Sequence, residues 1–67
     1  MPPEQIEFDG KEYRRVGGEV HRRPVEREGL SAFEAAWLVI PKEDREKELP
    51  PMVLAHFTQA ENKAAIN

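Results

Sequence analysis

Six basic side chains in the N-terminal half of the chain are suited to one kind of chemistry, the binding of phosphate groups in DNA or RNA. They are Lys11, Arg14, Arg15, Arg22, Arg23 and Arg27. They alternate with four glutamates, Glu12, Glu19, Glu26 and Glu28, so the net charge of residues 11–28 is only +2. Opposite charges interleaved in this way are typical of ion pairs on a solvated face. A nucleic-acid face made of Arg14, Arg15, Arg22 and Arg23 is therefore the second hypothesis and not the first.

Catalytic and metal-binding patterns are weak in this sequence. The chain has no cysteine, which excludes disulfides and thiolate sites. His21 and His56 lack the spacing of a zinc motif, and Ser31 lies where it would cap a helix, outside a GxSxG motif. A chain this short also has little volume for a pocket of about 300 Å³ or more. The sequence therefore predicts no catalytic, cofactor-binding or metal-binding residue, and a protein that is not an enzyme on its own.

Length and composition predict one small domain over residues 1–67, with residues 1–4 and 60–67 expected to be mobile. No apolar run approaches the ~20 residues of a membrane span, and residues 1–4 do not form a signal peptide, which indicates a cytoplasmic protein. The net charge of −3 argues against binding to an anionic membrane. A charged content of 34% with few Ser, Thr, Asn and Gln fits a thermophilic source or, equally, a GC-rich genome.

Two turn sequences predict a three-stranded antiparallel meander over residues 5–25. Asp9-Gly10 and Gly17-Gly18 are two-residue turns of the kind that require positive φ, and they lie one strand length apart. The register that they set places Ile6 opposite Tyr13. Side chains alternate along a strand, so one face of the meander becomes apolar and the other charged. The apolar face holds Ile6, Phe8, Tyr13 and Val20.

A helix is predicted to begin at Ser31, which forms a capping box with Glu34. Four apolar residues recur at helical spacing and would lie on the apolar face of the sheet. They are Phe33, Ala36, Trp37 and Ile40. Pro41 would end this helix near Val39. The bulky residues 37–40 leave a strand as the alternative.

The C-terminal third of the chain permits two interpretations. Residues 42–48 are all charged and predict a solvated loop or a single helical turn. Residues 52–57 are apolar except for His56 and predict a strand, followed by a short helix that Thr58 and Glu61 would cap. A continuous helix over residues 52–65, with Pro51 in its first turn, is the alternative.

These elements predict an α+β fold. Its sheet would have three to four antiparallel strands in the order β-β-β-α-β, with one helix on its apolar face and a short helix at the C-terminus. Segments 37–40 and 52–57 hold more large apolar residues than so small a fold can cover, and exposed apolar patches mark interfaces. The expected interface consists of Trp37, Leu38, Val39, Met52, Leu54 and Phe57, with Trp37 and Phe57 as its anchors.

The sequence therefore predicts a small protein-binding module, or an accessory or regulatory subunit, that acts through this apolar interface and is expected to self-associate. Its partner would be another protein or a second copy of the chain, because a disulfide-free chain of this size is close to energetic balance when it folds alone. The second hypothesis is a nucleic-acid-binding protein. The third is a component of a composite active site in a larger enzyme.

Overall fold

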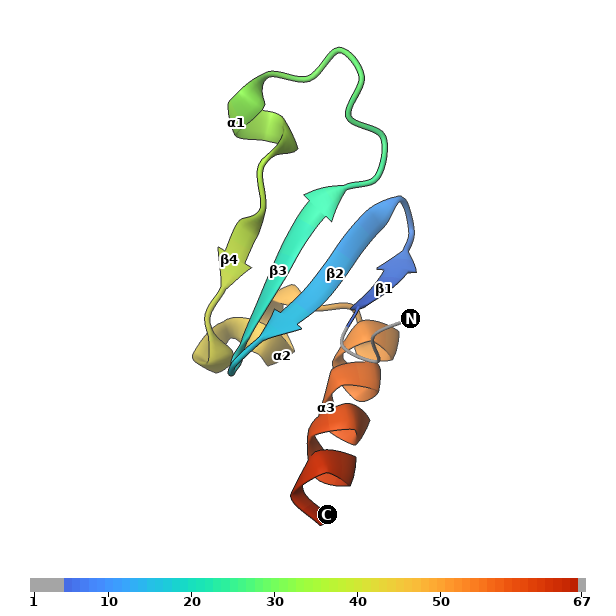
Figure 1. Cartoon of the computed structure of the whole chain (residues 1–67), viewed down its shortest axis with the longest axis vertical. Helices are drawn as coiled ribbons and strands as arrows, with labels where there is room; N and C mark the ends of the chain where they lie inside the picture. Colours follow the sequence, from blue (N-terminus) through green and yellow to red (C-terminus); the bar gives the residue numbers. More distant parts are fainter. Residues whose placement is uncertain (1–4, 67) are drawn as a thin grey trace.

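The computed structural model describes residues 5–66, which form a four-stranded antiparallel sheet with helices at its two ends (Figure 1). The strands follow chain order as β1 (Gln5–Phe8), β2 (Lys11–Val16), β3 (Glu19–Pro24) and β4 (Leu38–Ile40). Helix α1 (Ala32–Ala35) precedes β4, and η1 (Lys42–Asp44), α2 (Arg45–Glu48) and α3 (Pro51–Ile66) follow it. The predicted α+β class is confirmed. Mobility was expected for residues 1–4 and 60–67. Residues 1–4 and 67 lie outside the described range, and residues 60–66 belong to α3.

The predicted meander is confirmed, including its register. Ile6 pairs with Tyr13 in β1–β2, and the β2–β3 ladder follows the expected alignment. Asp9 and Gly10 both have positive φ, 52° and 77°, as a type I′ turn requires. In the second turn only Gly17 is left-handed, at 65°, which is the pattern of a type II′ turn.

The β3–β4 ladder is short because Pro24 ends it. The Val25 N–H donates to the Gly10 carbonyl at 3.0 Å, on the β2 side of the strand. Backbone groups alternate in direction along an antiparallel ladder, so those of residue 24 point toward β4. Proline has no N–H to donate there. Pairing of β3 with β4 accordingly stops at Arg22 opposite Leu38, and beyond it the two segments diverge.

The helix predicted from Ser31 to near Val39 begins where expected but is wrong in its length. The capping box is present, but α1 ends at Ala35, and Leu38–Ile40 is the strand β4, the alternative that the bulky run allowed. In the ladder between β3 and β4, Val39 pairs with His21. Pairing with an existing sheet edge thus overrides the helical spacing of the apolar residues.

The strand predicted at residues 52–57 is also wrong, and the alternative of a continuous helix is correct. Helix α3 starts at Pro51, a position where the missing N–H costs nothing. Val53 and Phe57 lie one turn apart and are both fully buried. Thr58 lies inside this helix, so it does not cap a second one. The helix that covers the apolar face of the sheet is therefore α3 and not α1.

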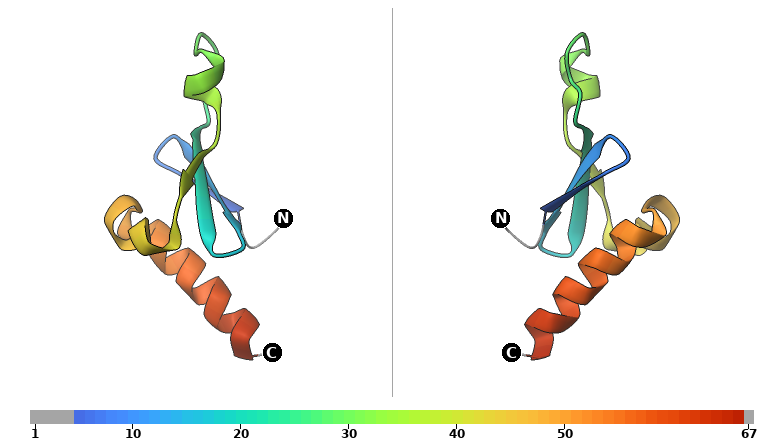
Figure 2. Two further views of the ribbon diagram at one scale, coloured as in Figure 1. Left: turned by 90° about the vertical axis from the view of Figure 1, so that its left-hand side faces the viewer. Right: turned by 90° about the vertical axis from the view of Figure 1, so that its right-hand side faces the viewer.

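The core lies on one face of the sheet, at the end away from α1. It consists of Tyr13, Val20, Ile40, Leu49, Val53 and Phe57, with Ile6, Phe8 and Leu54 packed against it. Figure 2 shows the axis of α3 inclined to the strands, and its last turns extend beyond the end of the sheet. The molecule is therefore elongated, 43 × 26 × 19 Å, with α1 and the core helices at opposite ends.

Candidate binding surface

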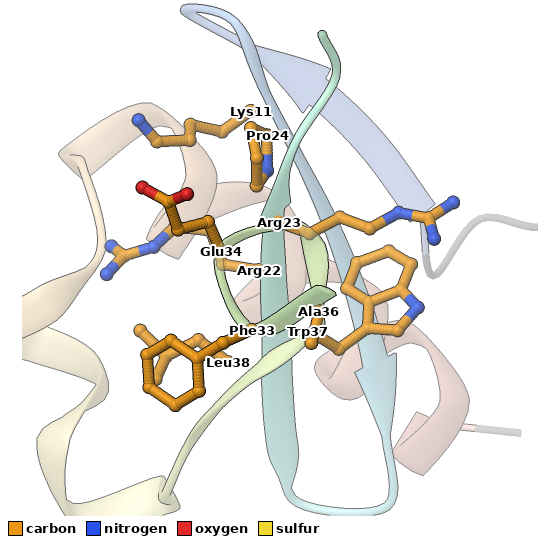
Figure 3. A pocket seen from close by; sticks show the side chains of 9 residues that line it. All are labelled: Lys11, Arg22, Arg23, Pro24, Phe33, Glu34, Ala36, Trp37 and Leu38. Carbon is orange, nitrogen blue, oxygen red and sulfur yellow. The ribbon is translucent and has the colours of Figure 1, made fainter. Parts of the chain in front are cut away.

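A hollow of about 370 Å³ lies between the end of β3 and the segment that joins α1 to β4 (Figure 3). We call it the α1 hollow. It is lined by Lys11, Arg22, Arg23, Pro24, Phe33, Glu34, Ala36, Trp37 and Leu38. The expectation that so short a chain lacks room for a pocket of about 300 Å³ is therefore wrong. The hollow exists because β3 and β4 diverge where Pro24 ends their ladder.

The α1 hollow includes the part of the sheet's apolar face that α3 does not cover. Tyr13, Arg22 and Leu38 are paired across three strands and so share a face, the one that carries the core. Tyr13 is buried beneath the helices, whereas Leu38 is 54% exposed. Phe33, at the outer end of α1, is 92% exposed. Two large apolar side chains therefore face solvent beside an open hollow.

Local hydrogen bonds fix the start of α1 and thereby the place of Phe33. The Glu34 N–H donates to the Ser31 hydroxyl at 3.1 Å, and the Ser31 N–H donates to the Glu34 carboxylate at 3.0 Å. The bond that the Ser31 N–H donates to the carboxylate, and then the Ser31 side chain, hold the pKa of Glu34 below its ordinary value. Gly29, with φ of 84°, makes the turn before the cap, in a conformation that favours glycine. The single turn of α1 is thus specified by its own sequence.

The charges around the α1 hollow are mainly positive. Lys11 is exposed and makes no ion pair with any side chain in residues 5–66. Arg22 donates from Nη1 to the Glu48 carbonyl at 3.3 Å, a contact that leaves its charge uncompensated. The carboxylate of Glu34 is already bonded to Ser31. Lys11 and Arg22 are therefore available to pair with acidic groups.

Trp37 turns to the opposite, charged face of the sheet. The guanidinium carbons of Arg14 and Arg23 lie 4.2 and 4.3 Å from its ring centroid, within cation–π range. Arg14 also donates to Nδ1 of His21 at 3.3 Å. Figure 3 shows Trp37 and Arg23 on one side of β3, with Phe33 and Leu38 on the other. Trp37 therefore anchors the wall of the α1 hollow to the sheet.

Glu12 holds the charged face together. It accepts from Arg23 at 3.4 Å and from Arg27 at 3.1 Å, which confirms the predicted pairing with interleaved glutamates for these two arginines. Burial raises the pKa of Glu12, but the hydrogen bonds and charges of the two arginines outweigh it, so the pKa lies below its ordinary value.

A second ionic cluster joins the far end of the sheet to α3. Nη1 of Arg45 donates to Oε2 of Glu61 at 3.0 Å, and Nη1 of Arg15 lies 4.0 Å from the same oxygen. The Arg45 side chain is only 7% exposed, although it comes from a charged run that predicted a solvated segment. This cluster fastens α2 and α3 to β2.

The predicted interface residues do not form one patch. Leu38 and Val39 lie on β4, half exposed, and Trp37 lies beside them, partly buried. Met52 is 66% exposed but is in α3, at the opposite end of the molecule from α1. The other two, Leu54 and Phe57, pack in or against the core, and Phe57 is fully buried. Of this set, only Trp37 and Leu38 line the α1 hollow.

Neither the exposure of Phe33 nor the position of Lys11 beside an apolar hollow was predicted from the sequence. Phe33 was assigned to a buried stripe because the helix was extended through Trp37 to Ile40. If residues 37–40 are interpreted as a strand, Trp37 and Ile40 no longer belong to the helical stripe, and nothing then places Phe33 in the core. Lys11 was counted among the phosphate-binding candidates, and its position beside an apolar hollow follows only from the placement of α1.

The chain was compared with protein families, curated proteins and solved structures, and no match was found. Within residues 5–66, no helix is both long enough and apolar enough to cross a membrane. In the same range, no three His, Asp or Glu side chains come together as a metal site would require.

Proposed function

We propose that the protein is a small protein-binding module whose binding surface is the α1 hollow together with the adjoining edge strand β4. The observation that carries this proposal is the exposure of Phe33, 92%, on a short helix that its own capping box holds in place. Large aromatic side chains dominate the energetics of protein interfaces. The capping box orders the backbone that carries Phe33 before binding, so less conformational freedom is lost when a partner binds.

The edge strand β4 supports the same proposal. It is the last strand of the sheet, and Leu38 and Val39 expose apolar surface on its two faces. An uncovered edge strand with apolar side chains can pair with an extended segment of another protein. The α1 hollow lies directly beside this edge, so one extended segment could contact both.

The arginines favour protein over nucleic acid as the partner. Three of the four that a nucleic-acid face would use are engaged within the chain. Arg14 and Arg23 lie over Trp37 and Arg15 lies near Glu61, whereas Arg22 donates only to a backbone carbonyl and keeps its charge available. A nucleic acid would have to compete with these contacts, and Trp37 would have to leave its arginines to stack on a base.

The test is affinity capture from a lysate of the source organism, comparing the unmodified protein with a double variant, Phe33→Ser with Leu38→Ser. Both side chains are exposed, so the variant should fold with little change in stability. Met52→Ser is the matched control, because Met52 is equally apolar and exposed but remote. We expect a protein that binds the unmodified chain and the control, is lost with the double variant, and binds directly when purified.

Two results would contradict the proposal. One is a partner that the double variant retains and the Met52 variant loses, which would place the interface on α3. The other is direct, salt-sensitive binding to DNA or RNA at micromolar affinity that depends on Arg14 and Arg22, which would favour the nucleic-acid hypothesis.

A further inference from the structure

We infer that the α1 hollow receives an acidic segment of its protein partner, with one apolar side chain between Phe33 and Leu38 and carboxylates facing Lys11 and Arg22. This inference rests on the proposed function and specifies the chemistry of the partner. It follows from the size of the hollow, from the distribution of its charges, and from the poor fit of a second copy of the chain to this surface.

The size of the hollow suits a short segment better than a folded surface. Its volume of about 370 Å³ is near the lower limit of ligand pockets, about 300–1,000 Å³. Pro24, Ala36 and Leu38 contribute apolar lining, and Phe33 stands at its edge. An apolar side chain placed there would leave water and contact these groups, as the anchor of a peptide does in its pocket.

The charges beside this apolar surface define the residues that should flank the anchor. Lys11 and Arg22 point to the side of β3 on which Phe33 and Leu38 lie (Figure 3). Lys11 makes no ion pair among residues 5–66, and Arg22 contacts only an uncharged carbonyl among the contacts found there. The one carboxylate in the lining, Glu34, accepts a hydrogen bond from the Ser31 N–H and keeps its negative charge. Lys11 and Arg22 outnumber it and leave an excess of positive charge beside the apolar lining, which carboxylates of a partner would compensate.

A second copy of the chain fits this surface poorly. A two-fold dimer through the hollow would bring the same patch from both subunits together. Both copies of the patch carry an excess of positive charge from Lys11 and Arg22, and juxtaposed patches of like charge oppose association. The charge of the hollow thus favours an acidic partner over self-association through this surface.

The experiment uses peptides of about nine residues that carry a fluorophore, and it follows their binding by fluorescence anisotropy. A label on the peptide is the direct readout, because the Trp37 ring lies on the opposite face of the sheet from Phe33 and Leu38. The first peptide has two central leucines flanked by aspartate and glutamate, the second has lysine in place of the acids, and the third has alanine in place of the leucines. We expect the first to bind, and the other two to bind at least tenfold more weakly.

Charge-reversed variants of the protein locate the effect. Lys11→Glu should weaken binding of the acidic peptide about five- to tenfold, because an attraction becomes a repulsion. Lys63→Glu makes the same change in net charge on α3 and should alter the affinity less than twofold. Raising the salt concentration from 50 to 300 mM should weaken the binding, and the effect should be smaller in the Lys11 variant.

The outcomes separate this inference from the proposed function. If the basic peptide binds as well as the acidic one, and Phe33→Ser abolishes both, the hollow is a binding surface but its preference for acid is refuted. The same holds if Lys63→Glu weakens binding as much as Lys11→Glu, or if no peptide binds while capture of the partner still depends on Phe33 and Leu38. A dimer in sedimentation equilibrium that Phe33→Ser dissociates would make a second copy the occupant and overturn the inference.

Discussion

Replacing Glu61 with glutamine should strongly destabilise the fold, because it leaves a buried cation without its partner. The Arg45 side chain is 7% exposed and donates to Glu61 at 3.0 Å. Breaking a fully buried pair costs about 3–5 kcal/mol, whereas an exposed pair contributes about 0–1 kcal/mol. Glu61 is 29% exposed, so the pair lies between these limits and we expect a loss of about 2–3 kcal/mol. The total free energy of unfolding of a chain of 67 residues is only about 3–10 kcal/mol.

The assay is urea denaturation followed by far-ultraviolet circular dichroism. With a slope of about 1 kcal/mol per molar urea for so small a chain, the midpoint should fall by about 2 M. Glu46→Gln is the matched control, because Glu46 is an exposed glutamate on α2 and its loss should cost less than 0.5 kcal/mol. Adding Arg45→Met to Glu61→Gln should recover part of the stability, since no buried charge is then unpaired. If Glu61→Gln and Glu46→Gln unfold at the same midpoint, the cluster does not fasten α3 as described.

Three further predictions concern the turns, the core and the charged face. Gly17→Ala should lower the free energy of unfolding by about 1–2 kcal/mol, because φ of residue 17 is 65°. Gly18→Ala should change it by less than about 0.5 kcal/mol, because φ of residue 18 is not left-handed. Equal losses of stability in thermal unfolding would contradict the type II′ turn. Phe57→Ala should cost about 3–5 kcal/mol and Met52→Ala less than 1 kcal/mol; equal costs would contradict the burial of Phe57 in the core. The Glu12 ion pairs stabilise the fold at pH values above the ordinary pKa of 4.5, and this stabilisation is lost as the pH falls through the lower pKa of the folded state. The difference in unfolding free energy between the unmodified protein and Glu12→Gln should therefore shrink from pH 6 to pH 3. A difference that is constant with pH would refute this role of Glu12.

The meander could be predicted because its determinants are local. The turn at Asp9-Gly10 requires two consecutive residues with positive φ, and only a few residue types tolerate this. Once the turns are placed, the alternation of apolar and charged residues leaves one register in which Tyr13 and Val20 share a face. The start of α1 was predicted for the same reason, since the capping box of Ser31 and Glu34 lies within four residues.

The remaining elements depend on contacts between distant parts of the chain. Residues 38–40 become a strand because the edge of β3 is there to pair with, and that pairing is invisible in the local spacing. Residues 52–57 are apolar on every side, so helix and strand both bury them. Helix α3 is consistent with Val53 and Phe57 facing the core one turn apart. The burial of Arg45 likewise follows from where α3 brings Glu61.

The candidate binding surface was predictable only in part. Leu38 and Val39 were identified because bulky side chains exceeded what the fold could cover, and both are exposed. Phe57 was proposed as an anchor for the same reason, yet it is fully buried in the core because residues 52–57 form a helix and not a strand. The α1 hollow itself depends on Pro24 ending the ladder and on α1 stopping at Ala35, two events whose combined effect appears only in three dimensions.

The most direct test of the central claim, that the α1 hollow is the binding surface, is a titration of the ¹⁵N-labelled protein with the captured partner, followed by amide chemical shifts. The account predicts the largest changes at Lys11, Arg22 and residues 32–38, with the amides of α3 unchanged. Shifts centred on α3, with those of the hollow unaltered, would contradict it.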